Sequence, residues 1–204
     1  MRVPRPARLI LASGSPRRRE LLTRAGLQFE IDVSEIDELI HDGESPVDAT
    51  ARLAIEKAEA VAARRAQQTD PHGEVVLAAD TTVVVGDRIL GKPADKQGAV
   101  EMLLSLSGRN HTVLTAWAVV PVAGGSRVAE CGLSRSTVRM REIARTEAIA
   151  YAESGEPLDK AGAYAAQGDG RRFIGAIEGP LDNVIGLPVA PVLAALARTG
   201  IVPS

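Results

Sequence analysis

The stretch Leu9–Leu22, which reads LILASGSPRRRELL, predicts a strand, a tight turn and a helix in direct succession. The apolar run Leu9–Ala12 is typical of a buried strand. Ser15 suits the N-cap of a helix, and Pro16 suits the first helical turn because its missing N–H is no loss there. Outward from this stretch, strand and helix patterns keep alternating along the chain.

The alternating patterns predict the fold class. Strands are expected at 29–33, 74–85, 88–90, 112–122, 127–141 and 173–177, and helices at 45–66, 95–107, 144–153 and 188–198. Helices separate some strands and hairpins join others, which favours an α/β fold with a mixed sheet in one domain over 1–204. The segment 154–172 is rich in glycine and charge, so it is expected to be a functional loop.

The composition excludes several kinds of partner. Aromatic residues make up 2% of the chain and the net charge is −2 with the signs intermixed, so neither stacking platforms nor a basic face for nucleic acid is expected. No apolar run approaches the ~18 residues of a membrane span. Cys131 is the single cysteine, which excludes a disulfide framework and fits a reducing compartment. We therefore expect a cytoplasmic protein without nucleic-acid or membrane partners.

Three arginines follow the expected N-cap at once. Arg17, Arg18 and Arg19 lie in the first helical turn, where positive charges oppose the helix macrodipole. An anion between the free N–H groups and the guanidinium groups would reverse that penalty. The turn is therefore expected to bind phosphate.

Asp80 is the strongest catalytic candidate. It lies in VVLAADTTVVV, a run that is apolar on both faces and typical of a central strand. A carboxylate there costs several kcal/mol unless it is paired, hydrogen-bonded or bound to a metal. A structural aspartate with a basic partner is the alternative, and a functional role is favoured because cationic candidates lie elsewhere in the chain. Thr81 alone is interpreted as an ordinary strand threonine.

Two lysines of the chain are interpreted differently. Lys92 lies in Gly86–Pro93, which nearly matches a P-loop, but Pro93 offers neither a hydroxyl for Mg²⁺ nor a backbone N–H, so a Walker-type ATPase is rejected. Lys92 is then either a point-charge phosphate contact or a solvated loop lysine. Lys57 lies in an Ala-rich helix, where its position alone predicts an exposed lysine paired with a neighbouring glutamate.

The loop after the second expected strand carries an acidic cluster. Glu35, Asp37 and Glu38 can form a site for a hard metal ion together with Asp80, although charged loops of this kind are usually solvated. The three histidines have no metal-ligand spacing, and His111 is expected to be structural.

Two amides in the C-terminal third are singled out. Gln167 lies in a loop of small residues that permits close backbone approach to a ligand, and its amide can read a base edge because it both donates and accepts. A loop glutamine bonded to backbone is the alternative. Asn183 is expected to cap a turn before the last helix.

Several blocks together resemble the Maf family, the septum formation inhibitor-like nucleotide pyrophosphatases. In chain order these blocks are SGSPRRRELL, AADTTVVVGDRILGKP, LSGRNHTVLTAWAV, GEPLDKAGAYAAQG and NVIGLP. The resemblance implies an elongated mixed sheet flanked by helices, with two lobes around a central cleft, related to the inosine-triphosphate pyrophosphatases. It also implies hydrolysis of a nucleoside triphosphate to the monophosphate and pyrophosphate with Mg²⁺ or Mn²⁺, and a possible homodimer.

The resemblance also implies roles for individual residues. Asp80 matches the general base, and Glu38 resembles an acidic residue placed near the metal. The residues that match phosphate-binding positions are Ser13, Arg17, Arg18, Lys57 and Lys92. The positions that sort the branches of the family by substrate are Arg17, Thr81 and Gln167.

The block AGAYAAQG, which contains Gln167, looks like the dTTP/UTP branch, whereas the 7-methyl-GTP branch has a Glu-like residue there. Thr82 departs from the family, where an aliphatic residue is common. Two other functions stay open: a 7-methyl-GTP pyrophosphatase, and a non-enzymatic nucleotide-binding regulator of septum formation.

Overall fold

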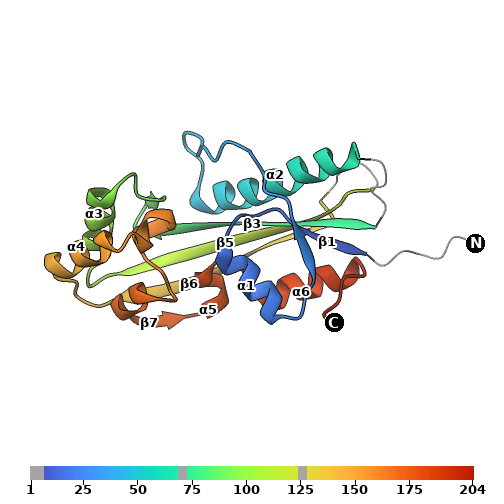
Figure 1. Ribbon diagram of the computed structural model, residues 1–204. Coiled ribbons are helices and arrows are strands. Elements are labelled where there is room, and N and C mark those ends of the chain that lie inside the picture. Colours follow the sequence, from blue (N-terminus) through green and yellow to red (C-terminus); the bar gives the residue numbers. More distant parts are fainter. Residues whose placement is uncertain (1–6, 69–72, 124–127) are drawn as a thin grey trace, which may run out of the picture. The chain divides into compact units, whose positions relative to one another are not determined.

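The computed structural model describes residues 7–68, 73–123 and 128–204 (Figure 1). Its seven-stranded sheet has the order β2-β1-β3-β5-β6-β7, with β4 paired to β3. The strands are β1 (Arg8–Leu11), β2 (Phe29–Ile31), β3 (Glu74–Val85), β4 (Arg88–Leu90), β5 (Asn110–Pro121), β6 (Glu130–Met140) and β7 (Ile174–Glu178). The α-helices are α1 (Pro16–Arg24), α2 (Pro46–Ala66), α3 (Lys96–Leu106), α4 (Arg145–Glu153), α5 (Leu181–Ile185) and α6 (Val189–Arg198).

The sheet is mixed, as the sequence predicts. Strand β1 pairs in parallel with both β2 and β3, whereas β3–β4 and β6–β7 are antiparallel pairs. The α/β fold with helices on the sheet is therefore confirmed. Across the three described ranges, we find no helix that combines the length and the apolar character needed to cross a membrane.

The chain divides into two compact units. Unit 1 comprises Met1–Asp80, Thr115–Leu133 and Gly186–Ser204, and unit 2 comprises Thr81–Leu114 and Ser134–Ile185. The single domain over 1–204 and the cleft between two lobes stay predictions.

Unit 1 has helices on both faces of its strands (Figure 1). On one face, Leu9, Leu11 and Leu77 join a core cluster with Leu22 of α1 and Leu196 of α6. On the other face, residues of β1, β3 and β5 pack against α2; this second cluster includes Ile10, Ala12, Val76, Ala78, Ala58, Val61 and Ala62. Successive side chains of a strand point to opposite faces, so Asp80 follows Val76 and Ala78 on the face that α2 covers.

Local signals fix the starts of the helices that position the site. The Ser15 hydroxyl accepts a bond from the Arg18 N–H, with Pro16 in the first turn of α1. The Ser45 hydroxyl accepts a bond from the Asp48 N–H at 3.1 Å and caps α2. The Ser45 hydroxyl in turn donates to the Asp48 carboxylate at 2.6 Å.

Unit 2 contains β4, α3, α4, β7 and three short 3₁₀ turns. These turns span Glu156–Asp159, Ala161–Ala163 and Asp169–Phe173, where the sequence predicts a loop. The expectation for Asn183 is wrong, since it lies inside α5 and its fully buried amide donates to the Val113 carbonyl at 3.1 Å and the Ser136 hydroxyl at 2.9 Å. The helix α5 is too short for its periodicity to be visible in the sequence.

Candidate functional site

A buried ion pair lies at the centre of the candidate site. Lys57 Nζ donates to Asp80 Oδ1 at 2.6 Å, and the two side chains are 8% and 10% exposed. Strand β3 supplies the carboxylate from the face that α2 covers, and α2 supplies the ammonium. The structural alternative for Asp80, a basic partner, is therefore realised, and this partner is one of the residues that the family resemblance singles out.

The expectation of an exposed Lys57 is wrong. Lys57 lies on the buried stripe of α2, one helical turn after Leu53 and one before Val61. The alanines beside it, Ala54 and Ala58, are completely buried and leave room for a long side chain. The helical spacing of Lys57 with its apolar neighbours was the signal in the sequence that could have predicted this burial.

A second carboxylate reaches the same ammonium. Glu38 Oε1 lies 2.9 Å from Lys57 Nζ, although the Glu38 side chain is 51% exposed. Glu38 belongs to the irregular segment between β2 and α2. Lys57 therefore bridges one buried carboxylate and one that faces solvent.

The turn after β1 brings Arg18 to this cluster. The Ser13 hydroxyl, which is buried, accepts bonds from Arg18 Nη1 at 3.1 Å and from the Ser15 N–H at 3.2 Å. Burial lowers the pKa of Arg18, and the negative charges of Asp80 and Glu38 act in the opposite direction. The guanidinium and the two carboxylates thus lie within one another's electrostatic influence. Phosphate binding at the turn stays a prediction.

One anchor of Arg18 was not predicted. Arg18 Nε donates to the Gly186 carbonyl at 2.8 Å, 168 residues away in the sequence. Gly186 has φ of +128°, a conformation that side chains rarely adopt. Nothing local to Arg18 points to this partner. Arg17 is half-buried, and its positive charge contributes to the lowered pKa of Arg18.

The donor set at the cluster fits a hard cation only in part. Among the residues that the structure describes, no group of three or more His, Cys, Asp or Glu side chains is placed to hold a metal ion. Glu35 and Asp37 therefore do not complete such a group with Glu38 and Asp80. Mg²⁺, however, is usually bound through one or two carboxylates together with substrate phosphates. The two carboxylates that converge on Lys57 fit that smaller requirement.

The remaining predicted residues belong to unit 2. Thr81 follows Asp80 in β3 and is half-buried, Lys92 is exposed after β4, and Gln167 is half-buried. The Gly162 N–H donates to the Gly91 carbonyl at 3.0 Å, which ties the segment of Lys92 to the loop of Gln167. The near P-loop is a hairpin through β4, in agreement with the rejection of a Walker-type site.

Buried side chains hold the loop of Gln167 in place, and their contacts with the loop were not predicted from the sequence. His111 Nε2 lies 2.7 Å from the Tyr164 hydroxyl, and both side chains are buried. The Tyr151 hydroxyl accepts a bond from the Ala165 N–H at 3.2 Å. His111 is structural, as expected.

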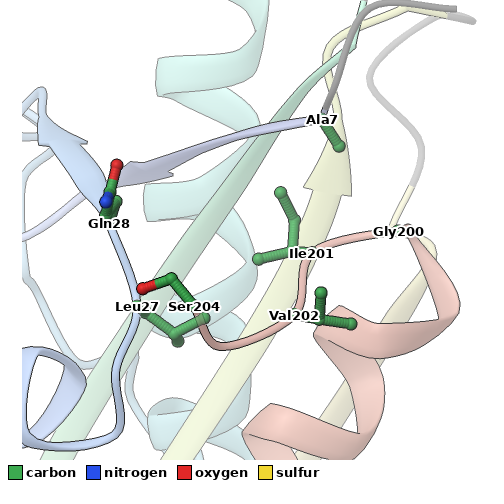
Figure 2. Close-up of a pocket in the computed structure, with 7 residues that line it drawn as sticks. All are labelled: Ala7, Leu27, Gln28, Gly200, Ile201, Val202 and Ser204. Atoms are coloured by element: carbon green, nitrogen blue, oxygen red, sulfur yellow. The ribbon is translucent and has the colours of Figure 1, made fainter.

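A pocket also lies beside the C-terminal segment of unit 1. Figure 2 shows the residues that line it, which are Ala7, Leu27, Gln28, Gly200, Ile201, Val202 and Ser204. None of the predicted site residues lines this pocket, and its side chains include no acid or base. It is therefore not the candidate site.

Fold and site together define a class: an α/β protein with a buried Lys57–Asp80 ion pair beside the strand–turn–helix of β1 and α1. The chain belongs to the family described as Maf-like protein, whose family model matches residues 8–199. The dTTP/UTP pyrophosphatase of Myxococcus xanthus is 46% identical over 95% of this chain and 93% of its own length. That of Hahella chejuensis is 46% identical over 97% and 95%, and that of Desulforamulus reducens 41% identical over 95% and 97%.

Two solved structures are similar to the chain at a lower level. A nucleoside-triphosphatase, or dITP/XTP pyrophosphatase, from Mycobacterium abscessus is 18% identical, with a TM-score of 0.43 over 94% of this chain and 95% of that chain. A HAM1 protein from Coxiella burnetii is 20% identical, with a TM-score of 0.45 over 82% and 80%.

Proposed function

We propose that the protein hydrolyses nucleoside triphosphates, dTTP and UTP above all, to the monophosphate and pyrophosphate. Relatives named dTTP/UTP pyrophosphatase, 41–46% identical over more than nine-tenths of the chain, support the reaction and the substrates. Within the structure, the observation that carries the proposal is the buried Lys57–Asp80 pair beside Arg18. Binding of a polyphosphate explains why these positive charges lie close together. A role in hydrolysis explains why a carboxylate lies with them.

In this proposal Asp80 is the general base. Its carboxylate accepts a proton from the water that attacks the α-phosphorus, so that the bond from that phosphorus to the pyrophosphate oxygen breaks. Lys57 carries three N–H donors, of which Asp80 and Glu38 account for two, and the third is proposed for a phosphate oxygen. Lys57 and Arg18 then offset the charge that develops on the leaving pyrophosphate.

Glu38 and Asp80 are the residues proposed to hold Mg²⁺ or Mn²⁺. When bound, a divalent cation neutralises phosphate charge and makes the phosphorus more open to attack. Two converging carboxylates support this assignment, because phosphate oxygens of the substrate can supply further ligands.

The remaining residues are proposed to bind and select the substrate. Ser13 and Arg17 extend the phosphate-binding turn, and Lys92 is a further phosphate contact. Arg17, Thr81 and Gln167 are proposed to select the base.

The match with the relatives covers more than nine-tenths of each chain. A homodimer and a cytoplasmic location stay predictions.

A nucleotide panel tests the proposed function. Purified protein with Mg²⁺ is given dTTP, UTP, CTP, dITP and 7-methyl-GTP, and pyrophosphate is measured separately from orthophosphate. We expect pyrophosphate release, fastest with dTTP and UTP. Release fastest with 7-methyl-GTP would assign the other branch, and nucleotide binding without any release would favour the non-enzymatic regulator.

Gln167→Glu tests the selection of the base. The substitution replaces an amide that donates and accepts by a carboxylate that only accepts, so the ranking of nucleotides by kcat/KM should change. We expect the preference for UTP over 7-methyl-GTP to fall by about tenfold or more, as for the loss of a good hydrogen bond. An unchanged ranking would remove Gln167 from the specificity residues.

A further inference from the structure

Glu38 holds an unusual position for a residue that contacts the buried centre. Its segment has no regular secondary structure from Asp32 to Glu44, and its side chain is half exposed. Even so, its carboxylate lies 2.9 Å from the buried ammonium of Lys57. An irregular segment holds such a position only if other contacts fix it, because ordering a free backbone costs conformational entropy.

One arginine of α2 supplies those contacts. Arg52 Nε and Nη2 donate to the two oxygens of Glu44, each at 2.7 Å, in the planar two-bond geometry that only arginine provides. Arg52 Nη2 also donates to the carbonyl of Leu39 at 2.9 Å, which belongs to the residue directly after Glu38. Arg52 Nη1 donates to Glu56 at 3.0 Å, one helical turn further along α2.

Glu44 closes the end of the same segment. Its carboxylate accepts a bond from the His41 N–H at 3.1 Å, and its own N–H donates to the His41 carbonyl at 3.0 Å. The bond from Arg52 lowers the pKa of Glu44 to about 2, so the pair stays charged at neutral pH. The Arg52 and Glu44 side chains are 21% and 12% exposed, so both are partly shielded from solvent.

The other end of the segment is held separately. Arg65 Nε donates to the Asp32 carboxylate at 2.6 Å, and Arg64 Nη2 donates to the Val33 carbonyl at 2.9 Å. Between these contacts and those of Arg52, the segment meets α2 again through Glu38 and Lys57. Contacts at three places along α2 therefore fix the course of the segment. The contact at Arg52 is the one made by the residue directly after Glu38.

We propose that Arg52 is a positioning residue for the proposed reaction: its guanidinium holds the Leu39 carbonyl and Glu44 so that the Glu38 carboxylate stays at Lys57 and Asp80. This inference rests on the proposed function for its kinetic consequence. Its structural consequence, an ordered 36–44 segment, can be measured without any turnover.

The first measurement is hydrogen exchange of the backbone amides of residues 36–44 by mass spectrometry. Arg52→Met keeps the length and apolar stem of the side chain and removes the guanidinium. We expect at least tenfold faster exchange in this segment and unchanged exchange in β1 and β3. Arg198→Met is the matched control, because it removes another two-bond arginine–glutamate pair, with Glu130, that the segment does not use.

The second measurement is a double-mutant cycle with Glu38→Gln, read as kcat and KM for UTP with Mg²⁺. Loss of a residue that supports a functional carboxylate typically costs about 10–100-fold. We expect Arg52→Met to lower kcat by such a factor alone, and by less than twofold when Glu38 is already Gln. Arg52→Lys should restore only part of the rate, because one ammonium cannot reproduce the two-bond geometry.

Glu44→Gln breaks the same pair from the loop side and keeps the inference testable if Arg52→Met does not fold. It should increase amide exchange and lower kcat in the same direction. Exchange and kcat like those of the wild type in either variant would overturn the inference, as would an equal loss of rate in both Glu38 backgrounds. If the wild type releases no pyrophosphate, the proposed function fails, and the exchange measurement alone decides the role of Arg52.

Discussion

Lys57 and Asp80 lie almost fully buried, with their charged groups 2.6 Å apart. Burial of two ions costs several kcal/mol each, and their attraction repays this only when the geometry is good. Apolar residues of similar volume would stabilise the core between α2 and β3 about as well. The pair is therefore poorly explained by stability alone, which favours a role in chemistry.

Removal of one partner should expose this cost. Lys57→Met leaves the Asp80 carboxylate buried with less compensation, and we expect the free energy of unfolding to fall by about 3–5 kcal/mol. The double variant Lys57→Met/Asp80→Asn removes both charges and should be more stable than the single variant. Urea unfolding at pH 7.5 measures both. If the double variant is no more stable than Lys57→Met, the claim that an uncompensated Asp80 charge causes the loss of stability is contradicted.

His111 should make stability depend on pH. Burial lowers the pKa of its imidazole to about 4, from about 6.5 in an unfolded chain. Between these pH values the unfolded chain binds a proton at His111 that the folded chain does not bind. The contribution of neutral His111 to the free energy of unfolding is therefore complete above pH ~6.5 and is lost as the pH falls towards 4. We expect a loss of about 2 kcal/mol from this group between pH 7 and pH 5.

The variant His111→Gln tests that assignment. A glutamine can still bond to the Tyr164 hydroxyl, and it does not titrate. The free energy of unfolding should then change less between pH 7 and pH 5 than in the wild type. Equal pH dependence in the two proteins would show that His111 is not the group responsible.

The loop that carries Gln167 depends on a backbone that few residues adopt. Gly162 has φ of +71°, and Ala163 follows it with φ of +59°, although alanine is disfavoured there. A Cβ on Gly162 would lie 3.0 Å from the nearest side-chain atom of Val83. The loop at Gly162 and Ala163 therefore needs both this left-handed backbone and close packing against β3.

Two glycine substitutions separate these effects. Gly155 has φ of +76°, and a Cβ added to it would meet no atom within 4 Å, so Gly155→Ala should cost only the left-handed backbone, about 1–2 kcal/mol. Gly162→Ala should cost about 1–3 kcal/mol more, because Val83 must move. Chemical denaturation compares the two. Equal losses would mean that the loop does not pack closely on β3.

Secondary-structure elements were easier to predict than contacts between residues that are far apart in the sequence. The apolar run around Asp80 predicts a buried strand, and Ser15-Pro16 predicts the start of α1, because both signals are local. The prediction of an exposed Lys57 was wrong, because it considered the neighbouring glutamates and not the helical spacing of Lys57 with Leu53 and Val61. Contacts such as Arg18 with Gly186 and Arg52 with Glu44 depend on tertiary packing, so no local pattern reveals them.

Over the whole chain, the predicted residues divide between the two units. Ser13, Arg17, Arg18, Glu38, Lys57 and Asp80 belong to unit 1, whereas Thr81, Lys92 and Gln167 belong to unit 2. One of the boundaries between the units falls at the peptide bond between Asp80 and Thr81. The proposed function assigns the proton transfer to unit 1 and most of the base selection to unit 2. A change at Asp80 should therefore affect the rate without affecting which nucleotide is preferred.

The most direct test of the central claim is the kcat for pyrophosphate release from UTP and dTTP by the wild type and by Asp80→Asn. A general base contributes about 10²–10⁴-fold, so we expect kcat to fall at least a hundredfold. The affinity for a non-hydrolysable UTP analogue and the order of the two nucleotides should be largely retained. Turnover by Asp80→Asn close to that of the wild type would contradict the assignment of Asp80 as the base.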